Sequence, residues 1–403
     1  MEFSRWKNFF VVFITLEILA VGFSFVLNDT NYFADKVAAV SKKIPVVTNA
    51  VPGAINMPQK LANPPKIIKA VFVTGYSAGS KKYLNYLTEL FKTTEINAVV
   101  VDIKGSDGYV TYNSGAPDVA KYNLYRGAIK DINGLIEFFH SQNIYVIGRI
   151  ANFEDPVYSK VRPELAIYSK AETLTQNKLV LWQDRNKLSW LDPASRSVWD
   201  YNISLAKDGL ANGFDEINFD YVRFPTDGKA GDMGFPTWNG TKVKADVINE
   251  FFHYVRNALP GEKLSVDLFG QVTTNTDDMG IGQLLENAFE NFDYISPMVY
   301  PSHYIDGFDG FPKPAEHPYD VIKYALDTAI LREANYKTKN PTIVKLAQFR
   351  PWLQDFKMGA VYTASMIKDE IRATQDSLGS NYNGFMLWNA GNRYTAEAVQ
   401  NSQ

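Results

Sequence analysis

From Ala70 to the C-terminus, short strand-like runs alternate with helix-like runs, and this alternation limits the fold more than any other feature. The strand-like runs are rich in valine, isoleucine, phenylalanine and tyrosine, and apolar residues spaced by three and four mark the helices between them. Strands are expected at residues 70–78, 97–105, 144–151, 213–225, 263–270, 292–301, 342–352 and 383–391. Eight strands that are each followed by a helix predict a parallel (β/α)8 TIM barrel.

An open, doubly wound sheet is the alternative fold. Nucleotide-binding sheets of that kind carry a glycine-rich phosphate turn after the first strand, and Gly75-Tyr-Ser-Ala-Gly79 fits neither the dinucleotide nor the P-loop spacing. The barrel is therefore favoured, as a domain at residues 67–403. Its longest loops, at 106–130, 152–194, 224–240 and 301–317, all follow strands. They are expected at the C-terminal face, where barrel enzymes bind their substrates.

The first 66 residues differ from the rest. Residues 6–27 form a mostly apolar run that is long enough to cross a bilayer, with Arg5 and Lys7 at its start and Glu17 as the only charge further in. We expect residues 1–27 to be a cytoplasmic stub and an uncleaved transmembrane signal anchor; a cleaved signal peptide is the alternative. Residues 28–66 contain scattered prolines and predict a linker. Either reading places the barrel outside the cytoplasm, on a single-pass membrane protein or secreted.

The composition excludes several classes of function. The chain has no cysteine, so disulfides, thiol catalysis and thiolate metal sites are ruled out. Its net charge of −3 argues against nucleic-acid binding. Four histidines without metal-ligand spacing argue against a zinc enzyme, and no Gly-x-Ser-x-Gly motif is present. We therefore expect neither a metal centre nor a cofactor.

The most informative segment is Gly213–Pro225, with the sequence GFDEINFDYVRFP. Its residues alternate between an apolar face and a polar face that carries Asn218 and Asp220, as in a strand, and Pro225 ends it because proline cannot donate to a sheet. A buried Asp220 needs a partner or a function. Arg223 is the expected partner, and the structural alternative is that Asp220 only braces Arg223.

Carboxyl groups and aromatic rings at the predicted strand ends are the candidate functional residues. Glycoside hydrolysis needs two carboxyl groups, one ionised and one protonated. Asp220 and Asp267 lie on neighbouring predicted strands, and we expect both to be catalytic, Asp220 as nucleophile or base and Asp267 as a general acid with a raised pKa. Among loop tryptophans, Trp182, Trp190 and Trp238 are candidates for sugar stacking. The expected substrate-binding residues are Tyr76, Asp102, Lys104, Trp190, Asn218, Arg223, Tyr300, His303 and Trp388.

These residues also have structural interpretations. Asp267 could anchor a loop, and Asp102 with Lys104 could form an ion pair that serves the fold. Tyr300 and His303 could be packed loop residues. The sequence alone leaves these alternatives open.

The segment 213–225 resembles the hallmark of a glycoside hydrolase-like domain of bacterial exported proteins, a family formerly of unknown function and related to alpha-amylase-type barrels. The resemblance covers about residues 68 to 400 and extends to four further segments, VDIK (101–104), WLDP (190–193), SPMVYPSHY (296–304) and PWLQDF (351–356). It implies a TIM barrel that acts on a polysaccharide.

The resemblance also implies roles for two residues. In amylase-type barrels the nucleophile is an aspartate at the end of strand four, which matches Asp220, and the acid is a carboxyl group on strand five, which matches Asp267. That acid is usually a glutamate, and Asp267 is shorter by one methylene group. Glu216, Glu154 or Asp155 could therefore supply the acid instead.

Taken together, the sequence predicts a membrane-anchored, extracytoplasmic barrel that hydrolyses a glycosidic bond in an envelope or extracellular polysaccharide. The alternative is a non-catalytic glycan-binding or cell-wall-associated barrel. A hydrolase should hold its two carboxyl groups about 5 to 10 Å apart across an open cleft, whereas a binding protein could keep them in salt bridges. An esterase is disfavoured because no nucleophile–histidine arrangement is evident.

Overall fold

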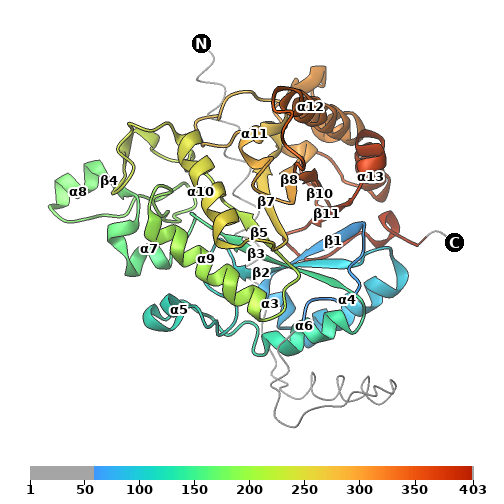
Figure 1. The fold of residues 1–403 in the computed structure, drawn as a ribbon, viewed down its shortest axis with the longest axis horizontal. Coiled ribbons are helices and arrows are strands. Elements are labelled where there is room, and N and C mark those ends of the chain that lie inside the picture. Colours follow the sequence, from blue (N-terminus) through green and yellow to red (C-terminus); the bar gives the residue numbers. More distant parts are fainter. Residues whose placement is uncertain (1–58, 402–403) are drawn as a thin grey trace, which may run out of the picture.

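The computed structural model describes residues 59–401 and shows a closed ring of parallel strands with helices around it (Figure 1). β11 closes the ring by pairing with β1, where Ile68 lies opposite Gly384. This confirms the predicted TIM barrel. Seven of the eight strand positions are single strands: β1 (Ile68–Val73), β2 (Ala98–Lys104), β3 (Tyr145–Ala151), β5 (Glu216–Asp220), β7 (Leu264–Phe269), β8 (Tyr294–Met298) and β11 (Gly384–Trp388).

The strand at the remaining position is broken in two. β9 (Gln348–Phe349) pairs with β8, and β10 (Trp352–Gln354) pairs with β11 and with Met298 of β8. Pro351 stands between the two pieces and has no N–H to donate, but its carbonyl oxygen accepts a hydrogen bond from the N–H of Met386 at 2.9 Å. The prediction of one strand over 342–352 was therefore too long at its start and missed the break.

Amphipathic helices cover the outside of the ring. The principal helices are α4 (Lys81–Thr93), α6 (Ile132–His140), α9 (Arg196–Ala211), α10 (Lys244–Ala258), α11 (Leu285–Ala288), α12 (Pro318–Lys339) and α13 (Ala364–Leu378). On α10, Val247, Phe251 and Val255 are buried while the opposite face is exposed, as the sequence pattern predicts. The Ser80 and Thr363 side chains accept hydrogen bonds from backbone N–H groups in the first turns of α4 and α13.

Two predicted strands end five residues earlier than expected, which is the largest difference at the C-terminal end of any single strand. β1 stops at Val73 because the Thr74 side chain accepts a hydrogen bond from the N–H of Ser77 and starts a short helix, α3 (Gly75–Ala78). β5 stops at Asp220 because Tyr221 has a left-handed backbone, with φ of +52°. Both changes occur at the C-terminal ends of the strands, so they shape the mouth of the barrel.

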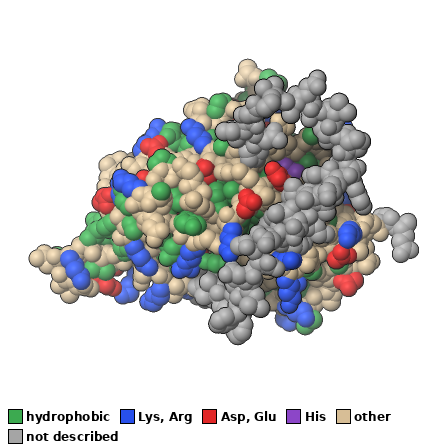
Figure 2. Space-filling view, turned by 90° about the horizontal axis from the view of Figure 1, so that it is seen from below, with side chains coloured by type: hydrophobic (Ala, Val, Ile, Leu, Met, Phe, Trp, Pro, Cys, Tyr) green, Lys and Arg blue, Asp and Glu red, His purple; other side chains and the backbone are tan. Residues whose placement is uncertain are grey.

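The long loops carry small elements of their own. The loop after β3 contains α7 (Tyr158–Val161) and α8 (Lys170–Gln176), and α8 projects from the body at the left of Figure 1. β4 (Tyr168–Ser169) pairs antiparallel with β6 (Met233–Gly234), which joins this loop to the one after β5. The loop after β2 contains α5 (Pro117–Tyr122). On the described part of the face shown in Figure 2, acidic and basic side chains are interspersed rather than gathered by sign.

The segment just before the barrel packs against the face where the strands begin. The N–H of Leu61 donates to Asp215 Oδ1 at 2.6 Å, and Lys60 forms an ion pair with Glu262. Asp215 precedes β5 and Glu262 precedes β7. The end of the predicted 28–66 linker is therefore docked to the barrel.

The predicted anchor at 1–27 and most of that linker lie outside the described residues. Within residues 59–401, no helix is both long enough and apolar enough to span a bilayer.

Candidate functional site

Two neighbouring cavities open at the C-terminal ends of the strands. The smaller has a volume of about 30 Å³, and we call it the carboxylate hollow; its lining includes Asp220, Asp267, Tyr300, His303, Trp352 and Trp388. The larger has a volume of about 460 Å³, and we call it the side pocket; its lining includes Tyr76, Asp102, Asp107, Tyr109, Arg126 and Arg149. Trp388 lines both cavities, so they adjoin.

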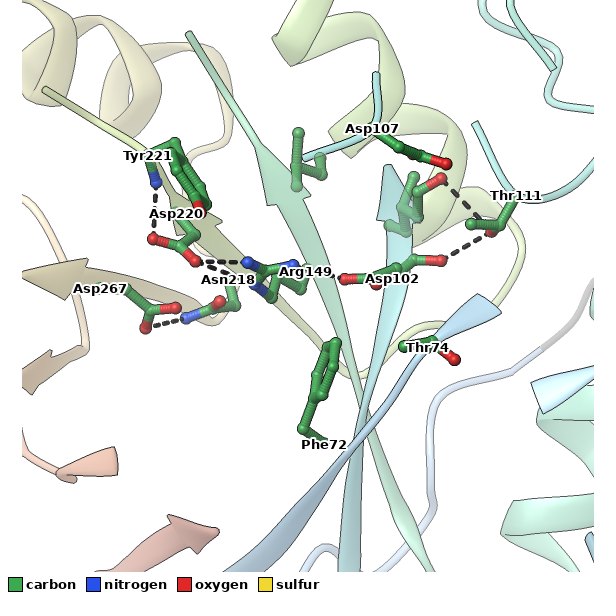
Figure 3. A network of polar contacts seen from close by, with 12 residues as sticks. Phe72, Thr74, Asp102, Asp107, Thr111, Arg149, Asn218, Asp220, Tyr221 and Asp267 are labelled. Atoms are coloured by element: carbon green, nitrogen blue, oxygen red, sulfur yellow. Dashed lines mark hydrogen bonds and ion pairs between the residues drawn. The ribbon is translucent and has the colours of Figure 1, made fainter. Parts of the chain in front are cut away.

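Arg149 links the two cavities through a buried ion-pair network (Figure 3). Its Nε and Nη2 atoms donate to Asp220 Oδ2 at 3.0 and 2.6 Å, and its Nη1 atom donates to Asp102 Oδ1 at 2.7 Å. β3 places Arg149 directly between these partners, because β3 pairs with β2 on one side and with β5 on the other. The guanidinium also lies 5.3 Å from the ring centre of Trp388. Its position is thus fixed on several sides.

The backbone after Asp220 is arranged to contact its carboxyl group. The N–H of Tyr221 donates to Asp220 Oδ1 at 2.6 Å. Tyr221 holds the positive φ that ends β5, a conformation that costs free energy for a residue with a large side chain. Strained backbone of this kind clusters at functional sites.

Asp267 differs from Asp220 in its surroundings. It is almost fully buried on β7, and its Oδ1 atom accepts a hydrogen bond from Asn218 Nδ2 at 2.8 Å. Burial, and then the negative charge of Asp220, raise the pKa of Asp267 well above its usual value; Asn218, Arg149 and Trp352 act in the opposite direction. The hollow therefore combines an ion-paired carboxylate with a carboxyl group that tends to keep its proton.

The structure corrects the predicted partner of Asp220. Arg149, not Arg223, forms the ion pair with Asp220. Arg223 lines the hollow, but its guanidinium lies 4.7 Å from the ring centre of Trp190 and its Nη1 atom donates to the carbonyl of Phe224. Arg223 was predicted because it lies close to Asp220 in the sequence. The observed ion pair instead joins Arg149 on β3 to Asp220 on the neighbouring strand β5.

Lys104 was expected to contact substrate, with an ion pair to Asp102 as the structural alternative; the structure does not form that pair, and Lys104 lines neither cavity. Lys104 is fully buried and its Nζ atom lies 2.7 Å from Asp155 Oδ2. The register of β2 shifts between Asp102 and Lys104, which sends the two side chains to different surroundings. Asp155, one of the alternative candidates for the general acid, is therefore ion-paired with Lys104.

The other alternative acids also lie away from the hollow. Glu216 is fully buried inside the barrel, where it pairs with Arg350 and accepts a hydrogen bond from the hydroxyl of Tyr145 at 3.3 Å. Glu154 is fully buried in the loop that follows β3, where its backbone forms an isolated antiparallel β-bridge with the backbone of Trp190. Neither lines either cavity.

Three loop tryptophans were candidates for sugar stacking, and none of them lines the carboxylate hollow or the side pocket. Trp190 is fully buried and donates to Asp184 Oδ2 at 3.1 Å; Trp182 is buried and donates to the carbonyl of Lys229. Trp238 packs against Phe224 and Phe235. Large loops can bury their own rings, so a loop position did not imply exposure.

The remaining predicted residues lie at the mouth. Tyr300 and His303 line the hollow, Tyr76 and Asp102 line the side pocket, and Trp388 lines both. Asn218 is close by but fully buried and lines neither cavity, and its side-chain amide donates to Asp267 and to Ser265 Oγ.

Two features of the site were not predicted. Arg149 is recognisable from the sequence as a polar residue at a strand end, but its pairing with Asp220 was missed, although a lone charge in the apolar run IYVIGRIA signals a paired interior position. Trp352 lines the hollow and approaches Asp267; it lies in the segment PWLQDF that carries part of the resemblance, but it was not named as a site residue. The signal for the break between β9 and β10 was Pro351, which cannot donate to a sheet.

Several solved structures resemble the chain. A hypothetical protein from Ruminiclostridium thermocellum is 42% identical over 49% of this chain and 96% of its own, with a TM-score of 0.44. An alpha-galactosidase from Thermus thermophilus is 12% identical over 82% of this chain, which spans 59% of that enzyme, with a TM-score of 0.47. A beta-N-acetylhexosaminidase from Bacteroides fragilis is 10% identical over 84% of this chain and 67% of its own, with a TM-score of 0.49.

Among curated proteins, none matches the sequence. One family model does match, and it covers residues 70–394, which is the barrel from β1 to beyond β11. The chain therefore belongs to the family described as "Putative glycosyl hydrolase domain".

Proposed function

We propose that the chain hydrolyses a glycosidic bond in a polysaccharide, with Asp267 as general acid and Asp220 as nucleophile or base. The observation that carries this proposal is the pair of carboxyl groups in one hollow, of which one is ion-paired and the other has a raised pKa. Two carboxyl groups in opposite protonation states are what glycoside hydrolysis requires.

The neighbouring residues suit these roles. Asp267 would donate its proton to the glycosidic oxygen as the bond breaks, and Asp220 would either attack the anomeric carbon or remove a proton from the attacking water. Arg149 and the N–H of Tyr221 fix the Asp220 carboxylate in one orientation, so less conformational entropy is lost when the reacting groups align. Asn218 does the same for Asp267.

A second candidate is a non-catalytic glycan-binding barrel. It is favoured by the ion pair between Asp220 and Arg149, and by the volume of the hollow, about 30 Å³, which holds roughly two waters and no sugar ring. Hydrolysis requires side chains of the hollow to move when the glycan binds, whereas simple binding does not.

We further propose that the substrate is an envelope or extracellular polysaccharide and that the barrel works outside the cytoplasm at a membrane. The support is the apolar run at residues 6–27 with Arg5 and Lys7 at its start. Localisation of the chain by cell fractionation, with protease added to intact spheroplasts, tests this. Protection of the barrel from that protease would contradict it.

The activity test compares the whole chain with Asp220→Asn and Asp267→Asn. Each protein is incubated with α- and β-linked glycans and with purified cell wall, and both reducing-end release and binding are recorded. Asp246→Asn, an exposed substitution on α10, is the control. Release by the wild type that falls about 100- to 10,000-fold in both site variants, with binding retained, supports hydrolysis. Binding without release by any of the proteins supports the glycan-binding candidate.

A further inference from the structure

The side pocket has the room that the carboxylate hollow lacks. Its volume of about 460 Å³ falls in the range of about 300 to 1,000 Å³ that small-molecule sites occupy. The hollow, at about 30 Å³, has space only for water. Since both are lined by Trp388, a glycan that reaches Asp220 and Asp267 passes directly beside the side pocket.

Aromatic rings form part of the wall of the side pocket. Tyr76 is 40% exposed and lies on α3, and Tyr109 faces the pocket from the loop after β2. Arg126 connects them, with its guanidinium 3.7 Å from the ring centre of Tyr109 and its Nη1 atom 3.3 Å from the Tyr76 hydroxyl. Deeper in, the Trp388 ring is stacked on Phe72 at 4.1 Å. Amphipathic rings held in place in this way suit the faces of a sugar.

Two carboxyl groups converge on one point of the same pocket. A methyl group in place of a Gly105 hydrogen would lie 3.2 Å from Asp107 Oδ1 and 3.6 Å from Asp102 Oδ2. Glycine leaves that point open to the cavity. Carboxylate oxygens accept hydrogen bonds from sugar hydroxyl groups, and bonds to a charged acceptor are stronger than those between neutral groups.

The charged groups around the side pocket favour a neutral sugar over an anionic one. Two carboxyl groups, Asp102 and Asp107, and two guanidinium groups, Arg126 and Arg149, line the side pocket. Arg149 is also ion-paired with Asp220 of the adjoining hollow, so this connected group of five side chains carries one more carboxyl group than guanidinium groups. A uronate or another anionic sugar would add a further negative charge to this group and would be disfavoured. A neutral sugar with free hydroxyl groups would not.

We infer that the side pocket is a second subsite, which holds a neutral sugar unit next to the one at Asp220 and Asp267 through stacking on Tyr76 and hydroxyl contacts with Asp102 and Asp107. This inference rests on the proposed function for the position of the scissile bond. If the side pocket is such a subsite, the substrate is an uncharged glycan, and chains of two or more sugars bind more tightly than single sugars.

Binding is measured by calorimetric titration of the whole chain carrying Asp267→Asn, which removes the proposed acid. The probes are neutral tetrasaccharides of glucose and of galactose, in α and β linkage, and a tetrasaccharide of galacturonic acid. Each titration is repeated with Tyr76→Ala or Asp107→Asn added. The controls are Tyr125→Ala, a tyrosine that is 39% exposed and lies outside the pocket lining, and Asp246→Asn.

At least one neutral tetrasaccharide should bind, and the galacturonate should bind at least tenfold more weakly. Tyr76→Ala and Asp107→Asn should each weaken neutral binding about tenfold, while the two control substitutions leave it unchanged. Equal binding of the galacturonate, equal losses in the controls, or no binding by any neutral tetrasaccharide would overturn the subsite.

Kinetics of the chain with Asp267 intact separate this inference from the proposed function. If reducing ends are released but KM is unaffected by Tyr76→Ala and Asp107→Asn, hydrolysis stands and the subsite fails. If neutral tetrasaccharides bind through Tyr76 and Asp107 but no reducing ends appear, the subsite stands and hydrolysis fails.

Discussion

At the scale of single residues, the two neighbouring carboxyl groups of the site differ in their hydrogen-bond donors and in their electrostatic surroundings. Asp220 receives three N–H donors, two from Arg149 and one from Tyr221, whereas Asp267 is buried beside that negative charge with Asn218 as its hydrogen-bond donor. The two residues are of the same type on adjacent strands, so their chemical difference comes from their surroundings, which for Asp267 means burial first and the charge of Asp220 second.

The raised pKa of Asp267 predicts a particular pH dependence of the rate. A general acid works only while protonated, so kcat/KM should fall as pH rises through the pKa of Asp267. Asp267→Asn should lower kcat about 100- to 10,000-fold and remove this alkaline limb from the residual activity. The measurement is a pH–rate profile of both proteins. An alkaline limb that persists in the variant would assign the acid role to another group.

His303 predicts a dependence of stability on pH. Burial lowers the pKa of His303 to about 3, whereas in the unfolded chain it is about 6.5. As pH falls, the unfolded chain binds this proton first, so the stability is fully present above pH 6.5 and is lost toward pH 3, by up to about 1.4 kcal/mol per pH unit.

Substituting His303→Gln should therefore flatten the decline in unfolding free energy between pH 6.5 and 4, as measured by urea denaturation. His253→Gln, an exposed histidine on α10, is the matched control and should leave the slope as it is in the wild type. Equal slopes in His303→Gln and the wild type would refute the assignment.

At the scale of elements, the closure of the barrel depends on Gly384 at the start of β11. Its φ is +113°, and a Cβ atom there would lie 1.7 Å from the carbonyl oxygen of Ile68 on β1. No side chain can be accommodated without separating the first strand from the last, since the obstacle is backbone.

Gly384→Ala should destabilise the fold by about 3 kcal/mol or more, because it adds a clash to the cost of a positive φ. Gly240→Ala is the control, since Gly240 also has a positive φ, of +81°, but no atom lies near its Cβ position. The control should cost about 1 kcal/mol. Thermal unfolding of both variants measures the difference, and equal losses would show that the close approach of β1 and β11 is unimportant.

The order of strands and helices was predictable because alternation in hydrophobic pattern is a local property of the sequence. The strand ends were less so: Tyr221 stops β5 through its backbone conformation, and Pro351 breaks the seventh strand. The site residues divide in the same way, into those marked by a local sequence pattern and those set by contacts in the folded chain. Asp220, Asp267 and Trp388 were found from strand-end positions, but the Arg149 pairing depends on which side chains meet across strands, and the burial of Trp190 depends on how a long loop folds.

At the scale of the whole molecule, the barrel has two faces with separate tasks. The mouth carries both cavities, and the opposite face carries Asp215, which accepts hydrogen bonds from Leu61 and Val146 and contacts His140. We therefore expect substitutions on the opposite face to change stability without changing the binding of a ligand at the mouth.

Asp215→Ala tests this separation. It should lower the unfolding free energy by about 2 to 4 kcal/mol, because buried N–H donors lose their acceptor, and leave KM for the substrate unchanged. Denaturant unfolding and steady-state kinetics measure the two effects. The exposed Asp246→Ala is the reference. A changed KM with unchanged stability would contradict the separation.

The contacts of Lys60 and Leu61 with the barrel fix where the described chain enters it, relative to the two carboxyl groups. The chain enters the barrel on the face where strands begin, and Asp220 and Asp267 lie on the face where they end, about 20 Å away for strands of six residues. The described chain therefore enters the barrel at the end opposite to both carboxyl groups. A partner that bound at Lys60 and Leu61 would leave the carboxylate hollow and the side pocket uncovered.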